Sequence, residues 1–208
     1  MSRIIAICNQ KGGVGKSTTA VNVGSYLALA GHSTLLLDLD PQGNATTACG
    51  IQRQQVEKDM YDVLIDRLQI HEAVLHTSIP NFDLIPSTID LAVAEPKLAM
   101  IEHRELILKE LISQITSKYS FVLFDCPPSL GLLTVNALVA ADSTIIPVQC
   151  EYLALEGLNA LLQSINLVKQ KLNPTLRVGG IVLTMTDFRA NLNKEVADEV
   201  KRFFKDQV

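Results

Sequence analysis

Residues that can bind phosphate groups follow one another from Lys11 to Thr18, in the order Lys-Gly-Gly-Val-Gly-Lys-Ser-Thr. Glycine has no Cβ, so this backbone can wrap closely around phosphate oxygens and point its N–H groups inward. Lys16 can reach the outer phosphates, and the hydroxyl of Ser17 can bind Mg²⁺. The sequence therefore predicts a phosphate-binding loop whose residues are Lys11, Gly12, Gly13, Val14, Gly15, Lys16, Ser17 and Thr18.

The elements on both sides of this loop support that interpretation. A short apolar run, Ile4–Cys8, precedes it, and a helix-compatible run follows it to Ala30 and ends at Gly31. A strand, a glycine-rich turn and a helix N-terminus are the context that a phosphate-binding loop needs. The alternative is a plain glycine turn capped by Ser17 or Thr18, and the combination of motif and context disfavours it.

Three carboxylates follow apolar runs that are typical of buried parallel strands. Asp38 ends the run from Ser33 and is followed by Asp40, and Asp125 ends the run from Phe121. Four apolar residues and then aspartate form the Walker B pattern, which places a carboxylate near the Mg²⁺ hydration shell. Because ligands bind at the carboxyl ends of strands in an open α/β sheet, we expect these groups beside the phosphate loop.

Apolar runs and helix-compatible runs alternate along the rest of the chain. Together with the elements above, they predict six strands in a doubly wound α/β domain with a mostly parallel sheet. The remaining strands are expected at Phe82–Pro86, Ser143–Val148 and Arg177–Met185. Helices are expected at Val56–Leu68, at Leu91–Ile101 with an interruption at Pro96, at Arg104–Ser117, at Leu132–Ala141, in a long run to about Leu172, and near the end of the chain.

Composition limits the class of protein further. The 208 residues fit one domain, 48% of them are apolar, and no apolar run approaches the ~20 residues of a membrane span. The four scattered cysteines indicate reduced thiols in the cytosol, and the chain enters its first strand too early for a signal peptide. The formal net charge is −4, but residues 169–208 hold eight Lys/Arg against five Asp/Glu, a net +3. That bias is compatible with a DNA-facing surface or with an ordinary solvated helix.

The loop resembles the deviant Walker A motif of the ParA/MinD superfamily of ATPases, which carries an additional lysine at the position of Lys11. The resemblance implies that Lys11 reaches the nucleotide of a dimer partner. The segment from Asp38 to Asn44 looks like the switch I segment of ParA, which makes Asp40 the residue that orients the attacking water and places Asp38 near Mg²⁺. The segment from Asp125 to Gly131 resembles switch II, and the segment from Pro147 to Leu158 is similar to Soj-like chromosomal members.

This resemblance implies a ParA/Soj-like partition ATPase, a P-loop NTPase that uses ATP and Mg²⁺. Such a protein would form an ATP-dependent homodimer, bind DNA non-specifically and hydrolyse ATP slowly with a ParB-type partner, in the cytoplasm at the nucleoid. By motif position, Arg189 would contact DNA, and Lys194, Lys201 and Arg202, which lie downstream on or near the final helix, would add contacts to phosphate. Residues 1–208 would be a single ATPase domain without the C-terminal strand and helix that members usually have.

Two other interpretations remain open at this point. A MinD-like membrane-surface switch would use the same ATP-driven dimer and anchor through a basic amphipathic helix, and the final helix has Val196, Val200, Phe203 and Phe204 on one side. Core packing of that side is the simpler explanation. An iron–sulfur reductase would need cysteines that bridge a cluster, and the positions of Cys49 and Cys126 do not favour it.

Overall fold

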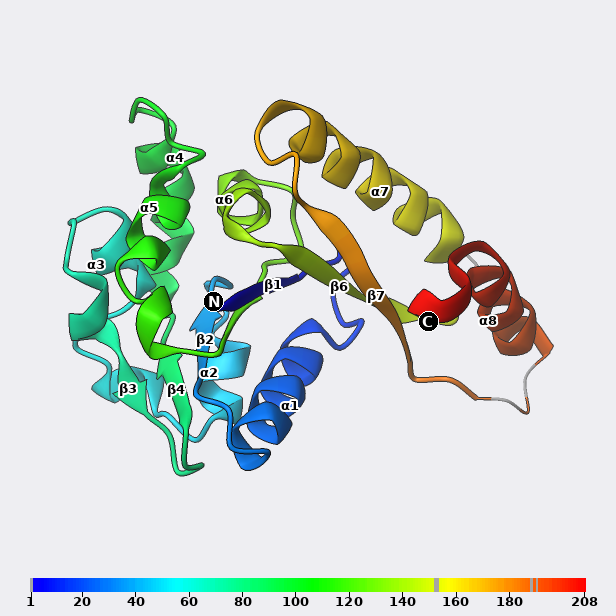
Figure 1. Cartoon of the computed structure of the whole chain (residues 1–208), viewed down its shortest axis with the longest axis horizontal. Coiled ribbons are helices and arrows are strands. Elements are labelled where there is room, and N and C mark those ends of the chain that lie inside the picture. Colours follow the sequence, from blue (N-terminus) through cyan, green and yellow to red (C-terminus); the bar gives the residue numbers. More distant parts are fainter. Residues whose placement is uncertain (1, 152–153, 188, 190) are drawn as a thin grey trace.

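The computed structural model describes residues 2–151, 154–187, 189 and 191–208. Within them, seven strands form one sheet in the order β3-β4-β2-β5-β1-β6-β7 (Figure 1). All neighbouring strands run parallel except β3, which pairs antiparallel with β4. The strands are β1 (Arg3–Ile7), β2 (Thr34–Asp38), β3 (Leu75–His76), β4 (Phe82–Ile85), β5 (Phe121–Asp125), β6 (Ser143–Gln149) and β7 (Arg177–Thr184).

Helices cover both faces of this sheet, as a doubly wound fold requires. The helices α1 (Lys16–Leu29) and α2 (Asn44–Ala48) pack on one face, and the other helices pack on the opposite face (Figure 1). The latter are α3 (Met60–Leu64), α4 (Ala94–Leu98), α5 (Ile107–Ser113), α6 (Leu132–Ala140), α7 (Ala154–Lys171) and α8 (Asn191–Phe204). Five short 3₁₀ segments, η1 (Arg53–Gln55), η2 (Ile70–Ala73), η3 (Ile89–Val93), η4 (Thr116–Lys118) and η5 (Lys205–Gln207), lie between or after them.

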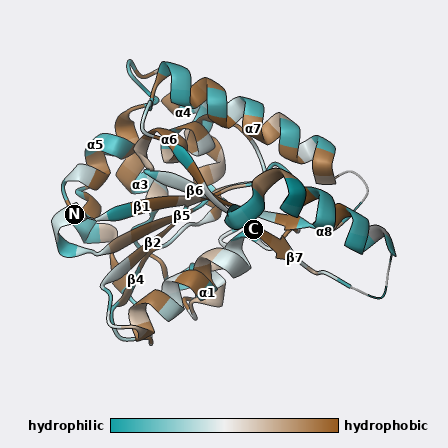
Figure 2. Ribbon diagram, turned by 45° about the vertical axis from the view of Figure 1, so that its right-hand side comes forward, coloured by the Kyte–Doolittle hydropathy of each residue, from teal (hydrophilic) through white to brown (hydrophobic). Residues whose placement is uncertain are grey.

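Side-chain alternation along the strands divides the core into two parts. Leu36 and Leu123 face α1, whereas Leu35, Leu37 and Phe124 face the larger group of helices. Every residue of β2 is buried, which explains why this strand reads as a continuous apolar run. Figure 2 shows apolar residues concentrated in the central strands and a hydrophilic outer side on α8.

The fold class and the strands around the phosphate loop are confirmed. The prediction of six strands was wrong by one, because β3 has only two residues and carries no alternation signal. Two predicted helices are shorter than expected: Val56–Leu68 contains only α3, and Arg104–Ser117 contains α5 followed by a 3₁₀ turn. Tyr152, within the predicted Soj-like segment, lies outside the described residues.

Candidate functional site

The predicted loop connects β1 to α1 at the carboxyl edge of the sheet. Gly13 and Gly15 have φ of 75° and 86°, in the left-handed region that favours glycine. Gly15 is the N-cap of α1 and offers no side-chain cap, and the first turn of α1 contains no acidic residue. The free N–H groups and the positive end of the helix dipole are therefore available to an anion.

A pocket of about 760 Å³ opens at this edge. Gly12, Gly13, Gly15, Lys16, Ser17 and Thr18 line it from the loop, and Asp40 lines it from the segment after β2. Pro128 and Met185 contribute from the segments after β5 and β7. The structure thus brings together, at one pocket, the loop and the segments that follow three other strands.

Lys16 is buried, with 6% of its surface exposed, and its Nζ donates to the carbonyl oxygen of Lys11 at 3.1 Å. Burial lowers the pKa of this ammonium group, and the nearby carboxylates of Asp125 and Asp40 partly offset the effect. A buried cation with so few partners gains most from an anionic ligand, so Lys16 is suited to bind phosphate.

Asp125 ends β5 beside Asp38 of β2, its partner in the strand register. Neither oxygen of its buried carboxylate has a hydrogen-bond partner of ordinary geometry among the described residues. Burial, followed by the charge of Asp38, raises the pKa of Asp125 to about 8, while the nearby Ser17 hydroxyl lowers it. Buried oxygens with unused lone pairs next to the serine of a phosphate loop fit the hydration shell of Mg²⁺.

Asp38 is also buried, but its carboxylate is already occupied. One oxygen accepts from the backbone N–H of Asp40 at 3.1 Å, and the other accepts from the backbone and hydroxyl of Thr46 at 2.8 and 2.7 Å. Burial is the main reason that the pKa of Asp38 rises to about 6, and these hydrogen bonds limit the rise. Asp38 therefore fastens the segment after β2 to α2, and its role near Mg²⁺ stays a prediction.

Asp40 lies in the pocket wall and is 7% exposed. Its Oδ1 accepts from the backbone N–H of Gln42 at 2.9 Å. Arg53 holds the same segment by donating to the carbonyl oxygen of Pro41 at 2.9 Å and by packing closely against Gly43, where a Cβ would lie 2.5 Å from its Nε. The carboxylate that we expect to orient water therefore stands on a well-supported loop.

Sequence reasoning missed several of the contacts that position this site. Thr46 was not singled out, and neither was α2, because five residues are too few for a periodic pattern. Thr184 donates to the carbonyl oxygen of Val14 at 2.9 Å, and the Asn9 amide donates to the carbonyl oxygen of Pro147 at 2.7 Å. The side-chain carbonyl of Asn9 accepts from the N–H of Lys11, and an asparagine shortly before a glycine loop was the only signal available.

The side chain of Lys11, the additional lysine, does not line the pocket as most of the loop does. Its ammonium group forms a salt bridge with Glu151, in the segment after β6, and both side chains are nearly half exposed. Lys11 is absent from the wall of the nucleotide pocket in its own chain.

The four predicted DNA-contacting residues are all at the surface. Arg189 is engaged by Asp187 in a two-pronged contact, with Nε and Nη2 each 2.9 Å from a carboxylate oxygen. Lys194 and Lys201 lie on α8 seven residues apart, which places them on one side of that helix, and Arg202 pairs with Glu199. Phe188, next to Arg189, lies outside the described residues.

The opposite side of α8 is part of the protein core. Val196, Ala197 and Val200 are buried, whereas Phe203 is 73% exposed. Cys126 is fully buried and Cys49 is partly buried, and the described residues contain no group of side chains suited to hold a metal on its own. No helix in the described part of the chain is long and apolar enough to cross a membrane.

The doubly wound sheet brings a phosphate loop and the unpartnered carboxylate at the end of β5 to the same edge. This arrangement defines a P-loop ATPase. A family model described as an AAA domain matches residues 2–178. The chain is 51% identical over 208 residues to the sporulation initiation inhibitor protein Soj of Bacillus subtilis, covering 100% of this chain and 82% of Soj. It is 46% identical over 208 residues to the chromosome-partitioning ATPase Soj of Treponema pallidum, covering 100% and 81%.

Solved structures agree with this result. A cobyrinic acid a,c-diamide synthase from Mycobacterium smegmatis, with a bound ATP analogue and magnesium, has a TM-score of 0.93 at 38% identity over 99% of this chain and 84% of that chain. A putative plasmid partition protein from Borrelia burgdorferi, bound to AMPPNP, has a TM-score of 0.85 at 29% identity over 100% and 83%. The chain belongs to the Soj/ParA family of chromosome-partitioning ATPases. It is an ATPase that uses ATP and Mg²⁺.

Proposed function

We propose that this chain is a Mg·ATP-dependent dimerising ATPase of the Soj/ParA type. In the ATP state it binds DNA non-specifically, and with a ParB-type partner it drives the segregation of a chromosome or plasmid. The names of its relatives support this proposal, and so do the exposed cations of α8. Residues 1–208 act as one ATPase unit, since the described elements pack around one sheet.

The residues at the carboxyl edge of the sheet have separate roles in phosphoryl transfer. The loop amides from Gly12 to Thr18 hold the phosphates, and Lys16 stabilises charge on the outer phosphate oxygens. Ser17 and, through water, Asp125 would hold Mg²⁺, which would offset phosphate charge. Asp40 orients the attacking water from the supported loop after β2.

The observation that carries the dimer proposal is the placement of Lys11. Its ammonium group lies outside the pocket of its own chain and is nearly half exposed, where a second subunit can approach. A lysine that reaches the phosphates of the partner stabilises the transition state only when two subunits enclose ATP. Glu151 keeps this cation near the surface until then.

The DNA surface combines Arg189 with the exposed side of α8. Contacts to phosphate need only cations on one side, without base-reading residues, so binding should weaken steeply as salt rises. Val196, Ala197 and Val200 of α8 are buried in the core, whereas Phe203 is exposed, so this helix offers a membrane little of its apolar side.

Variants of Asp40 and Lys16 test the proposed roles in the full chain. Lys16→Ala should abolish nucleotide binding, whereas Asp40→Ala should retain binding, lose hydrolysis, and accumulate an ATP dimer that light scattering detects after size exclusion. Asp66→Ala, which removes an exposed carboxylate away from the pocket, is the matched control and should behave like wild type. Equal hydrolysis rates in Asp40→Ala and wild type would remove Asp40 from the mechanism.

A further inference from the structure

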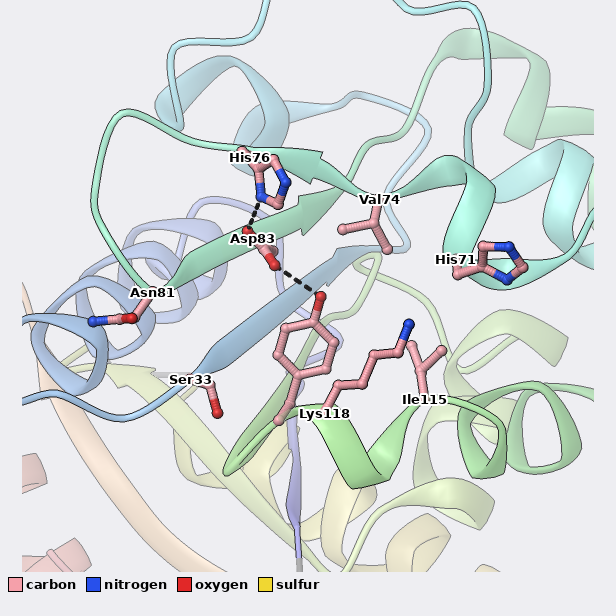
Figure 3. A pocket seen from close by; sticks show the side chains of 9 residues that line it. Ser33, His71, Val74, His76, Asn81, Asp83, Ile115 and Lys118 are labelled. Atoms are coloured by element: carbon pink, nitrogen blue, oxygen red, sulfur yellow. Dashed lines mark hydrogen bonds and ion pairs between the residues drawn. The ribbon is translucent and has the colours of Figure 1, made fainter.

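A second pocket, of about 560 Å³, lies at the opposite edge of the sheet, where the strands begin. Ser33, Asn81 and Tyr119 line it, and each lies within two residues before the start of β2, β4 or β5. Figure 3 shows this pocket from close by. The nucleotide pocket is formed by segments that follow the carboxyl ends of strands, so the two pockets share no lining residue.

The frame of this second pocket is held by backbone hydrogen bonds between the strand starts. The carbonyl oxygen of Ser33 accepts from the N–H groups of Ser120 and Phe121 at 2.7 and 3.1 Å. The N–H of Thr34 donates to the carbonyl oxygen of Asn81 at 2.9 Å. Three strands are thus joined at the pocket, which gives it a preformed shape.

The carboxylate of Asp83, which lines the pocket, already has two polar partners. Asp83 accepts from the Tyr119 hydroxyl at 2.8 Å through one oxygen and contacts His76 Nδ1 at 2.7 Å through the other (Figure 3). The hydrogen bond to Asp83 raises the pKa of His76. Each oxygen of this carboxylate thus has one polar partner among the described residues.

Lys118 adds a cation to the pocket. The ammonium group of Lys118 has no hydrogen bond or ion pair to any described residue, and in Figure 3 its side chain extends into the same hollow as Asp83. His71 lies on the same wall, from the 3₁₀ turn before β3. Val74 and Ile115 add an apolar part to the wall. A hollow with the ammonium group of Lys118, imidazole rings and an apolar wall matches an anion with a small apolar body.

We propose that this pocket at the amino edge of the sheet, built around Lys118, His71 and the His76–Asp83–Tyr119 group, binds a small organic oxyanion, a phosphate monoester or a carboxylate. The volume accommodates a small molecule, and the oxygens of an oxyanion can accept hydrogen bonds from an ammonium group and from imidazole N–H donors. The site is separate from the nucleotide pocket and does not depend on the proposed partition function.

The test uses the full chain saturated with Mg·ADP, so that the phosphate loop is occupied, in about 0.15 M salt, near physiological ionic strength. The ring signals of His71 and His76 in NMR spectra report directly on the pocket. Phenyl phosphate and benzoate are titrated separately to distinguish phosphate from carboxylate, benzyl alcohol serves as the uncharged probe, and sodium chloride is added at matched ionic strength. Saturable shifts with at least one of the two anions, without shifts from benzyl alcohol or chloride, are expected.

Lys118→Met removes the charge and keeps the length of the side chain, so it should weaken the binding of that anion by about tenfold. Lys109→Met, which changes an exposed lysine on the neighbouring helix α5, is the matched control and should leave binding unchanged. Both variants should retain the thermal stability of wild type, because neither lysine side chain contributes a hydrogen bond among the described residues. Unmoved ring signals with both anions, or equal affinity in Lys118→Met and wild type, would overturn the proposal.

Discussion

Replacing Asp125 by asparagine should flatten the pH dependence of stability in the nucleotide-free protein. In the folded state the pKa of this carboxyl is about 8, against an ordinary value of 3.8, chiefly because it is buried without partners. Between these two values the folded protein keeps a proton that the unfolded chain has released. Stability therefore falls as pH rises through this window and levels off above pH 8.

The size of this change in stability follows from the shift in the pKa of Asp125. Each pH unit within the window costs about 1.4 kcal/mol per retained proton, so wild type should lose about 2 kcal/mol between about pH 6 and pH 8 through Asp125. That range lies at or above the pKa of about 6 for Asp38, whose own contribution is mostly complete there. An asparagine side chain does not titrate, and therefore the Asp125→Asn variant should lose about 2 kcal/mol less over the same range.

Urea unfolding of wild type and Asp125→Asn at about pH 6, 7 and 8, without nucleotide or Mg²⁺, measures the difference. The comparison uses the slope with pH, because a buried amide without partners also changes the absolute stability. Asp66→Asn is the control for loss of one negative charge at an exposed position, and it should follow wild type. If the free energy of unfolding changes with pH equally in wild type and Asp125→Asn, then Asp125 does not keep its proton in the folded state, and the reasoning is refuted.

Three further substitutions test packing and charge. Gly24→Ala should destabilise the protein by about 2 kcal/mol in urea unfolding, since its Cβ would lie 2.6 Å from an aromatic ring of β4; an unchanged midpoint contradicts that contact. Thr46→Val should lower the free energy of unfolding by about 2 kcal/mol, because it removes the hydroxyl that donates to the buried carboxylate of Asp38. Wild-type stability in this variant would mean that other contacts hold the loop after β2. Asp187→Asn should free Arg189 and strengthen ATP-dependent DNA binding, measured by anisotropy, about twofold; weaker binding would exclude Arg189 from the DNA surface.

Local sequence patterns were sufficient for the strands and the loop that carry the chemistry. The run from Phe121 to Asp125 is buried over most of its length and ends at the carboxylate that we propose supports Mg²⁺, so both the strand and its end were visible in the sequence. The same holds for the loop from Lys11 to Thr18, because glycine spacing and a following helix are local features. Pro96, expected to interrupt a helix, lies in the first turn of α4, where proline is tolerated.

The parts that escaped prediction depend on contacts between distant residues. Lys11 and Glu151 are 140 residues apart in the chain, and nothing near either one indicates the other. The Asp83 hydrogen bond to Tyr119 likewise joins residues that only the sheet order brings together. Short elements were the second difficulty, since β3 has two residues and gains its place only by pairing with β4.

In the function proposed above, ATP controls DNA binding by this chain. Co-sedimentation with DNA in the presence of ATP, of ADP and without nucleotide, across a series of salt concentrations, tests it most directly. Binding only with ATP, and weaker as salt increases, is the result that we predict. Equal sedimentation in all three nucleotide states, or none with ATP although ATP binding is demonstrated, would contradict the claim.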